Sequence, residues 1–356
     1  MIYQNEIDNA LMWLFKTQNK ENFGWSWVRD ISPNAQNTAE VVYSCSLFVD
    51  RLSDDQKQLI NEAVSSWLLL PQKHAVLTID WVWIGYALLT YKNCFDKYNP
   101  EFDVAFVTKD INICIDNLLS LQNPDGGWGD HKNDLSTMFR TALVSTFLIR
   151  QDISNNDTIK VAIKKACTWI LGAQNDDGGF GNIKSENMSN SILECYSGIQ
   201  QDIVESQYLS SLSATGYALI AISSYNRHIY HKEIKHAIEF LKNASSNDKY
   251  EIFYEVGIRK NTLFTFRHFG AAWMGIGLLS TGHMHFTSPE ILNLVKHFLK
   301  LQDRISGGFK CESSSDVYTW SNCNALMFLY YVITDITKMN GIDYTDIIAE
   351  YYMQNN

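Results

Sequence analysis

Apolar residues recur along the chain at the three- and four-residue spacing of amphipathic helices. Ile111–Leu121 and Ala162–Leu171 are two such segments, and each would bury one face against a core. Each is followed by a polar stretch and then by a segment rich in apolar and small residues. The pattern predicts pairs of helices, an outer amphipathic helix followed by an inner one. The predicted inner helices are Thr38–Val49, Phe139–Ile149, Ser213–Ser223, Ala271–Ser280 and Asn324–Ile333.

A short phrase recurs between the helices of a pair. Gln122-Asn-Pro-Asp-Gly-Gly-Trp128 and Gln174-Asn-Asp-Asp-Gly-Gly-Phe180 are near-copies, Gln302–Phe309 has one insertion, and Gln18–Trp25 is a decayed copy. The glycine pair ends the preceding helix and permits a tight reversal, because glycine adopts positive φ at no steric cost. Each Gly-Gly pair is therefore expected after an outer helix, at one end of the molecule.

Two further helix pairs keep the rhythm without the phrase. Gln58–Leu70 is followed by Trp81–Tyr91, and Lys232–Lys242 is followed by the Ala271–Ser280 segment. Six outer and six inner helices result. Internal repetition of this kind indicates a repeat architecture in which each pair buries its apolar face against its neighbours.

The Q-x-x-D-G-G-W/F phrase resembles the QW repeat of squalene-hopene cyclases, class II terpene cyclases and protein prenyltransferase β-subunits, over nearly the whole chain. The resemblance implies an all-α fold, an α/α-toroid of six helix pairs (α6/α6 barrel), as a single domain over residues 1–356. It also implies that the Gln and the aromatic residue of the phrase tie neighbouring repeats together. Insertions near 182–207 and 243–266 are expected at the mouth of the barrel.

The predicted helix order has a consequence for ligand binding. If every outer helix reverses into an inner one, all inner helices are parallel and their N-termini meet at one mouth. Their positive dipole ends would favour an anionic ligand there. A diphosphate would suit such a mouth.

Candidate site residues stand at the starts and inward faces of the inner helices. Aromatic rings can hold an apolar chain and stabilise a cation, and arginine suits phosphate. The alternatives are rings that fill the core and arginines that pair with the carboxylates of Glu40, Asp80, Asp134 and Asp316. We expect Asp80 and His268 as catalytic residues, with Glu40, Asp134 and Asp316 as further acids or bases. We expect substrate contacts from Arg140, Arg267, Trp81, Trp83, Tyr217, Trp273 and Trp320.

The catalytic and metal-binding motifs of these enzyme families are incomplete in this sequence. Class II cyclases protonate their substrate with the middle Asp of D-x-D-D, and only Asp80, in Asp80-Trp-Val-Trp83, falls at a comparable place, as the first residue. The D-x-C of the prenyltransferase zinc site has Tyr318 instead of Cys, so no bound metal is expected. No cofactor is expected either, and Mg²⁺ would enter only with a diphosphate.

Composition limits which partners and which cellular location are expected. The formal net charge of -10 disfavours nucleic acid. The sequence shows neither a signal peptide nor an apolar stretch of transmembrane length, and its seven cysteines are scattered, so a cytoplasmic location is expected. Because a second barrel domain is absent, a homodimer or a partner chain would close the barrel. Peripheral membrane contact would accompany a hydrophobic ligand.

These observations predict a terpene cyclase-like or prenyltransferase-like protein that acts on or binds an isoprenoid or its diphosphate in an aromatic-lined cavity. If catalytic, it would be an atypical cyclase without D-x-D-D. The alternative is a catalytically silent toroid that recognises a hydrophobic ligand or a peptide. A third class, the α/α-barrel carbohydrate lyases and glycosidases, has a similar ring of helices but would not explain the QW phrase.

Overall fold

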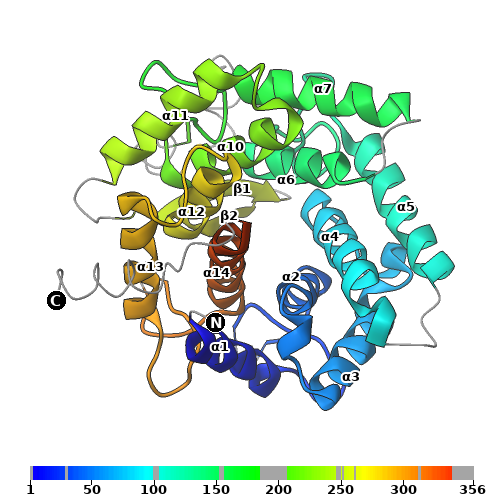
Figure 1. Cartoon of the computed structure of the whole chain (residues 1–356). Coiled ribbons are helices and arrows are strands. Elements are labelled where there is room, and N and C mark those ends of the chain that lie inside the picture. Colours follow the sequence, from blue (N-terminus) through cyan, green and yellow to red (C-terminus); the bar gives the residue numbers. More distant parts are fainter. Residues whose placement is uncertain are drawn as a thin grey trace.

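The computed structural model describes residues 3–28, 31–98, 104–151, 156–184, 207–245, 250, 252–259, 262–311 and 314–338. Within these ranges the chain forms two concentric rings of helices, an outer ring around an inner one (Figure 1). The outer helices are α1 (Gln4–Thr17), α3 (Asp54–Ala63), α5 (Val104–Leu121), α7 (Asp157–Leu171), α11 (His231–Ala244) and α13 (Pro289–Leu301). The inner helices are α2 (Ala35–Ser46), α4 (Thr78–Phe95), α6 (Met138–Ile149), α10 (Leu212–Asn226), α12 (Gly270–Ser280) and α14 (Thr319–Lys338). The predicted α/α-toroid of six helix pairs is confirmed.

The two rings differ in how much of each helix is buried. The outer helix α11 buries only Ile234, Ala237, Ile238 and Leu241, which form one stripe at helical spacing. The inner helix α10 buries every residue from Leu212 to Ser223, because it packs on the outer ring and on its inner neighbours α6 and α12. A helix with apolar residues on all sides is thus identified as a helix of the inner ring.

The repeated phrase joins neighbouring outer helices. The Gln122 amide Nε2 donates to the carbonyl of Gly126 in its own turn and to that of Ala162 on the next outer helix, α7, both at 2.9 Å. Trp128 is fully buried beneath the turn, where its indole N–H donates to the Leu118 carbonyl at 2.7 Å. The expected tying role of Gln and aromatic residue is therefore present.

The same pair of glutamine hydrogen bonds also joins the last outer helix to the first and so closes the ring. Gln174 contacts α11 in this way, and Gln302 contacts α1, the first helix of the chain, through the Glu6 carbonyl at 2.8 Å. The turn glycines have the predicted positive φ, and each pair follows an outer helix. These φ values are 94° at Gly126, 86° at Gly178 and 84° at Gly307.

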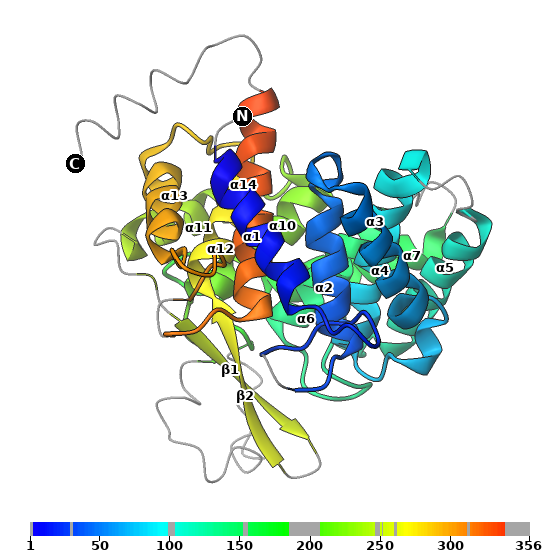
Figure 2. The ribbon, with the colours of Figure 1, turned by 90° about the horizontal axis from the view of Figure 1, so that it is seen from below.

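A β-hairpin precedes α12, within the expected insertion near 243–266. Strands β1 (Ile252–Arg259) and β2 (Thr262–Phe269) pair antiparallel, with Ile252 opposite Phe269 and Arg259 opposite Thr262. The hairpin projects from the ring on the side where the inner helices begin (Figure 2). Most of the other insertion, near 182–207, lies outside the described residues. In the described ranges no helix is long and apolar enough to cross a membrane.

Candidate functional site

A cavity of about 290 Å³ opens at the mouth where the inner helices begin. Its wall is mainly aromatic, with four polar side chains among the rings. The lining residues are Trp27, Val28, Gln36, Glu40, Trp83, Phe139, Tyr217, His268, Trp273, Tyr318, Trp320 and Asn324. Sites for small molecules commonly combine apolar walls with a few polar groups in this way.

Glu40 is the carboxyl group of this wall. It lies in the second turn of α2, buried to 4% exposure, one turn after Gln36 on the same helix face. Burial raises the pKa of Glu40 from 4.5 to about 7, and the hydrogen bond that its Oε1 accepts from the Gln36 amide at 2.9 Å opposes this only in part. A carboxyl with this pKa is substantially protonated near neutral pH, so it can donate a proton there.

Several rings of the wall lie in contact with one another, some from different helices and some from one segment of the chain. Tyr217 and Trp273 have ring centroids 4.1 Å apart, and Tyr318 and Trp320 are stacked with an interplanar angle of 11°. His268 is buried, meets Phe139 edge to face, and lies 3.5 Å by its Nδ1 from the Tyr217 hydroxyl. The wall therefore presents flat faces as well as ring edges to a ligand.

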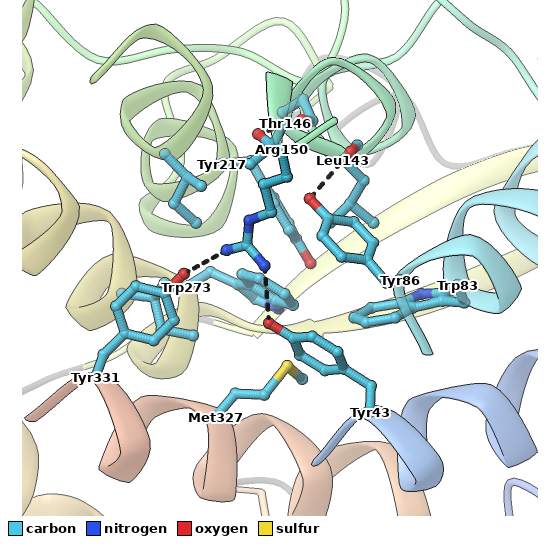
Figure 3. Close-up of a pocket in the computed structure, with 13 residues that line it drawn as sticks. Tyr43, Trp83, Tyr86, Leu143, Thr146, Arg150, Tyr217, Trp273, Met327 and Tyr331 are labelled. Atoms are coloured by element: carbon cyan, nitrogen blue, oxygen red, sulfur yellow. Dashed lines mark hydrogen bonds between the residues drawn. The ribbon is translucent and has the colours of Figure 1, made fainter. Parts of the chain in front are cut away.

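A second, smaller cavity of about 30 Å³ lies deeper along the barrel axis (Figure 3). It shares Trp83, Tyr217 and Trp273 with the mouth cavity. Arg150, at the C-terminal end of α6, reaches into it and donates to the hydroxyls of Tyr43 at 3.3 Å and Tyr331 at 2.9 Å. The two cavities therefore adjoin at the three shared side chains, with Glu40 in the wall of the first and Arg150 in the wall of the second.

The structure gathers six of the expected site residues at the mouth, namely Glu40, Trp83, Tyr217, His268, Trp273 and Trp320. Their expected roles remain predictions.

Four other expected site residues lie elsewhere. Asp80 caps α4 by accepting from the backbone N–H groups of Val76 and Leu77, both at 2.9 Å. Trp81 is buried in the core and lines neither cavity. Arg140 forms a buried ion pair with Asp130 at 2.7 Å. An ion pair was the alternative for this arginine, but Asp130 was not among the expected partners. The side chain of Arg267 lies outside the described residues.

Sequence reasoning missed Arg150, although a signal for it exists. Phe139, Leu143, Thr146 and Arg150 recur at helical spacing along α6, and all four line one of the two cavities. The inward position of Phe139 therefore predicts that of Arg150. For metals, no cluster of three or more His, Cys, Asp or Glu side chains occurs among the described residues.

Comparison with known proteins finds two kinds of similarity. Residues 136–258 match the family model of the squalene-hopene cyclase C-terminal domain, so the expected resemblance is confirmed over this part of the chain. No curated protein matches the chain in sequence. Solved structures match nearly all of it in fold.

Several of the matching structures are glycoside hydrolases. An inactive variant of the α-1,6-mannanase of a Salegentibacter species, in complex with α-1,6-mannotetrose, has a TM-score of 0.64 at 10% identity, covering 94% of this chain and 99% of its own. A family 76 glycoside hydrolase from a bovine Bacteroides thetaiotaomicron strain has 0.62 at 11%, covering 95% and 79%. An unsaturated glucuronyl hydrolase mutant of Streptococcus agalactiae, complexed with dGlcA-GalNAc6S, has 0.58 at 11%, covering 92% and 90%.

These similarities contradict the function expected from the sequence. The expectation was an isoprenoid or its diphosphate, or else a hydrophobic or peptide ligand on a silent toroid. The three structures named above, which match nearly the whole ring, are instead those of carbohydrate-processing enzymes. The geometry agrees, because Arg140, which was expected to hold the diphosphate, is neutralised by Asp130. The QW phrase holds neighbouring repeats together, a structural role that is compatible with more than one enzymatic activity.

Proposed function

We propose that this chain is a carbohydrate-processing enzyme that binds a sugar in the mouth cavity and cleaves a glycosidic bond with Glu40 as general acid. The observation that carries the proposal is the buried Glu40 carboxyl, with its pKa raised to about 7, in the wall of an aromatic-lined cavity. The α/α-toroid glycoside hydrolases that match the fold support the substrate class.

The proposed step needs one proton donor and one water. Glu40 gives its proton to the glycosidic oxygen as the bond between that oxygen and the anomeric carbon breaks. Water adds to the anomeric carbon, its proton passes to solvent, and Glu40 is reprotonated. General acid catalysis of this kind contributes roughly 10²–10⁴-fold to the rate.

The aromatic rings fit the same step. The C–H faces of sugar rings are apolar and pack on flat aromatic faces such as the stacked Tyr318 and Trp320. Positive charge develops at the anomeric carbon in the transition state, and ring faces such as those of Tyr217 and Trp273 can stabilise a cation.

One observation favours a second candidate, a carbohydrate-binding protein without turnover. Glycosidases commonly use two carboxyl groups, and among the described lining residues of the mouth cavity Glu40 is the one carboxyl. The two candidates differ in whether a bound sugar is cleaved.

The experiment is a comparison of wild type with Glu40→Gln on α-1,6-mannotetraose, dGlcA-GalNAc6S and a wider glycan panel. Binding is followed by the fluorescence of the cavity tryptophans and cleavage by mass spectrometry. We expect Glu40→Gln to retain binding and to lose cleavage by about 10²-fold or more, since the amide keeps the shape but has no acidic proton. Wild-type cleavage should fall about tenfold per pH unit above about pH 7, where Glu40 ionises.

Glu62→Gln on the outer helix α3 is the matched control and should leave both measurements unchanged. Sugar binding without cleavage by wild type would establish the second candidate. If no glycan of the panel binds, both candidates fail.

The cytoplasmic location belongs to the same proposal. The cysteines of the described residues, Cys45, Cys94, Cys114, Cys167, Cys311 and Cys323, are all free thiols. Free thiols are typical of a reducing compartment, which supports this location.

A further inference from the structure

Arg150 has no carboxylate partner in the part of the chain that the structure describes. Arg51 and Arg140, by contrast, form ion pairs with Asp8 and Asp130, both at 2.7 Å. The Arg150 guanidinium donates one N–H to Tyr43 and one to Tyr331, and it lies over the Tyr86 ring at 5.2 Å. A guanidinium has five N–H donors, and because the Arg150 residue is exposed to solvent, the other three are open to water or to a ligand acceptor.

The groups around Arg150 are donors as well. The Tyr43 and Tyr331 hydroxyls accept from Arg150, and each keeps its own hydrogen to donate. Tyr86 donates its hydroxyl hydrogen to the Leu143 carbonyl at 3.3 Å and is thereby satisfied. The deep cavity thus presents a planar cation and two hydroxyl donors, the complement of an oxyanion.

The size and position of the deep cavity indicate which oxyanion can enter. Its volume of about 30 Å³ has room for a carboxylate group and excludes a sugar ring. Tyr43 follows Glu40 by three residues on α2, so it lies about 4.5 Å deeper along the barrel axis. Trp83, Tyr217 and Trp273 line both cavities, so the two adjoin. A substituent of a sugar bound at Glu40 can therefore point toward Arg150.

A structural role of Arg150 gives a competing explanation. Arg150 is the C-cap residue of α6, and a cation at a helix C-terminus is stabilised by the helix dipole. That role requires only a positive charge, which lysine would also supply. Pairing with a carboxylate uses the planar fork of arginine, which lysine lacks. The structural role alone predicts no preference for a carboxylate ligand, whereas pairing predicts a preference that Arg150→Lys weakens.

We propose that the ligand of the mouth cavity is an acidic sugar, whose carboxylate pairs with Arg150, Tyr43 and Tyr331 in the deep cavity. This inference rests on the proposed carbohydrate function and names its substrate class.

The test uses pairs of sugars that differ only in a carboxylate against a hydroxymethyl group, such as glucuronides against glucosides and mannuronate against mannose oligosaccharides. Their affinities are measured by tryptophan fluorescence. We expect wild type to prefer the acidic member by about tenfold or more, the effect of one charge-assisted pair. Arg150→Gln should remove this preference, and Arg150→Lys should lose most of it.

Two further variants guard against misfolding and simple charge effects. Tyr331→Phe deletes one hydroxyl and leaves the guanidinium in place, and we expect it to lower the preference about two- to tenfold. Arg304→Gln removes the same formal charge from an exposed loop and should leave both affinities unchanged. Thermal unfolding of each variant shows whether it is folded.

The outcomes separate this inference from the proposed function. If neutral and acidic sugars bind wild type equally, or if the preference survives Arg150→Gln, the acidic-sugar assignment is overturned while the carbohydrate function stands. If Arg150→Lys keeps the full preference, pairing through the planar guanidinium fork is overturned, because a point charge then suffices. If acetate binds in an Arg150-dependent way and acidic sugars show no preference, the site takes a small free carboxylate. If no sugar binds, the proposed function itself fails.

Discussion

At the scale of single residues, the partner of a buried charge decides its chemistry. Asp130, in the loop before α6, and Glu40, on α2, are both buried carboxyl groups. Asp130 faces the guanidinium of Arg140, a full counter-charge, and thereby holds a loop to α6. Glu40 has only the neutral amide of Gln36, so its charged form is poorly stabilised and its pKa rises to about 7. The first arrangement suits structure and the second suits proton transfer.

The raised pKa of Glu40 makes stability depend on pH. Between about pH 4.5 and pH 7 the unfolded chain loses the Glu40 proton while the folded chain keeps it, so this contribution to the free energy of unfolding falls as pH rises. A rise of the pKa from 4.5 to about 7 corresponds to about 3 kcal/mol. Urea unfolding at pH 4 and pH 8 should therefore show Glu40→Gln gaining about 3 kcal/mol relative to wild type between the two pH values. A constant difference would mean that Glu40 ionises normally in the fold.

At the scale of elements, the glycine-containing turn of the repeated phrase requires a positive φ and also packs closely against the next outer helix. Gly178 has a φ of 86°, and a Cβ at this position would lie 2.6 Å from the backbone oxygen of His236 on α11. The glycine therefore serves both the reversal of the chain and the close approach of the next outer helix. These two needs explain why the Gly-Gly pair recurs in the phrase.

We expect Gly178→Ala to lower the free energy of unfolding by about 2 kcal/mol or more, because strain at positive φ adds to a clash with backbone. The matched control is Gly172→Ala at the end of α7. Gly172 has a φ of −68°, and its new Cβ would meet the flexible end of Lys184. This control should change stability by less than about 1 kcal/mol. Thermal and urea unfolding measure both, and equal effects would argue against the tight packing of the turn on α11.

At the scale of the whole molecule, the last pair of helices packs on the first. Gln302 bonds the Glu6 carbonyl of α1, and the Asn322 amide on α14 donates to the Ala10 carbonyl of the same helix at 3.0 Å. The N-terminal helix therefore lies beside α13 and α14, as Figure 1 shows. Closure holds the six inner helices around a common axis, and so it holds the walls of both cavities in place.

Closure of the ring predicts that the contact between the last and first outer helices contributes as much to stability as a contact between neighbouring outer helices inside the ring. Gln302→Ala removes two hydrogen bonds, to Glu6 and Gly307, and Gln122→Ala removes the equivalent two inside the ring. We expect each substitution to lower the free energy of unfolding by a similar amount, about 1–3 kcal/mol. A cost at Gln122 with none at Gln302 would show that the ring is open in solution.

The sequence by itself determined the repeat and hence the ring. Helix spacing, the glycine pair and the Gln and aromatic residue act over a few residues or between adjacent repeats, so the phrase can be interpreted locally. The hairpin could also have been predicted, because two runs rich in β-branched and aromatic residues flank Lys260-Asn261. The segment was expected only as an insertion.

The tertiary structure alone decided the chemistry of the site. Arg140 and Arg150 lie ten positions apart at the two ends of the α6 segment, and nothing in their local sequence shows that one pairs with Asp130 while the other meets Tyr43 and Tyr331. The protonation of Glu40 likewise follows from burial among side chains of other inner helices. Helix formation depends on near neighbours along the chain. Burial and charge pairing depend on which side chains of distant helices converge, and only the closed ring brings them together.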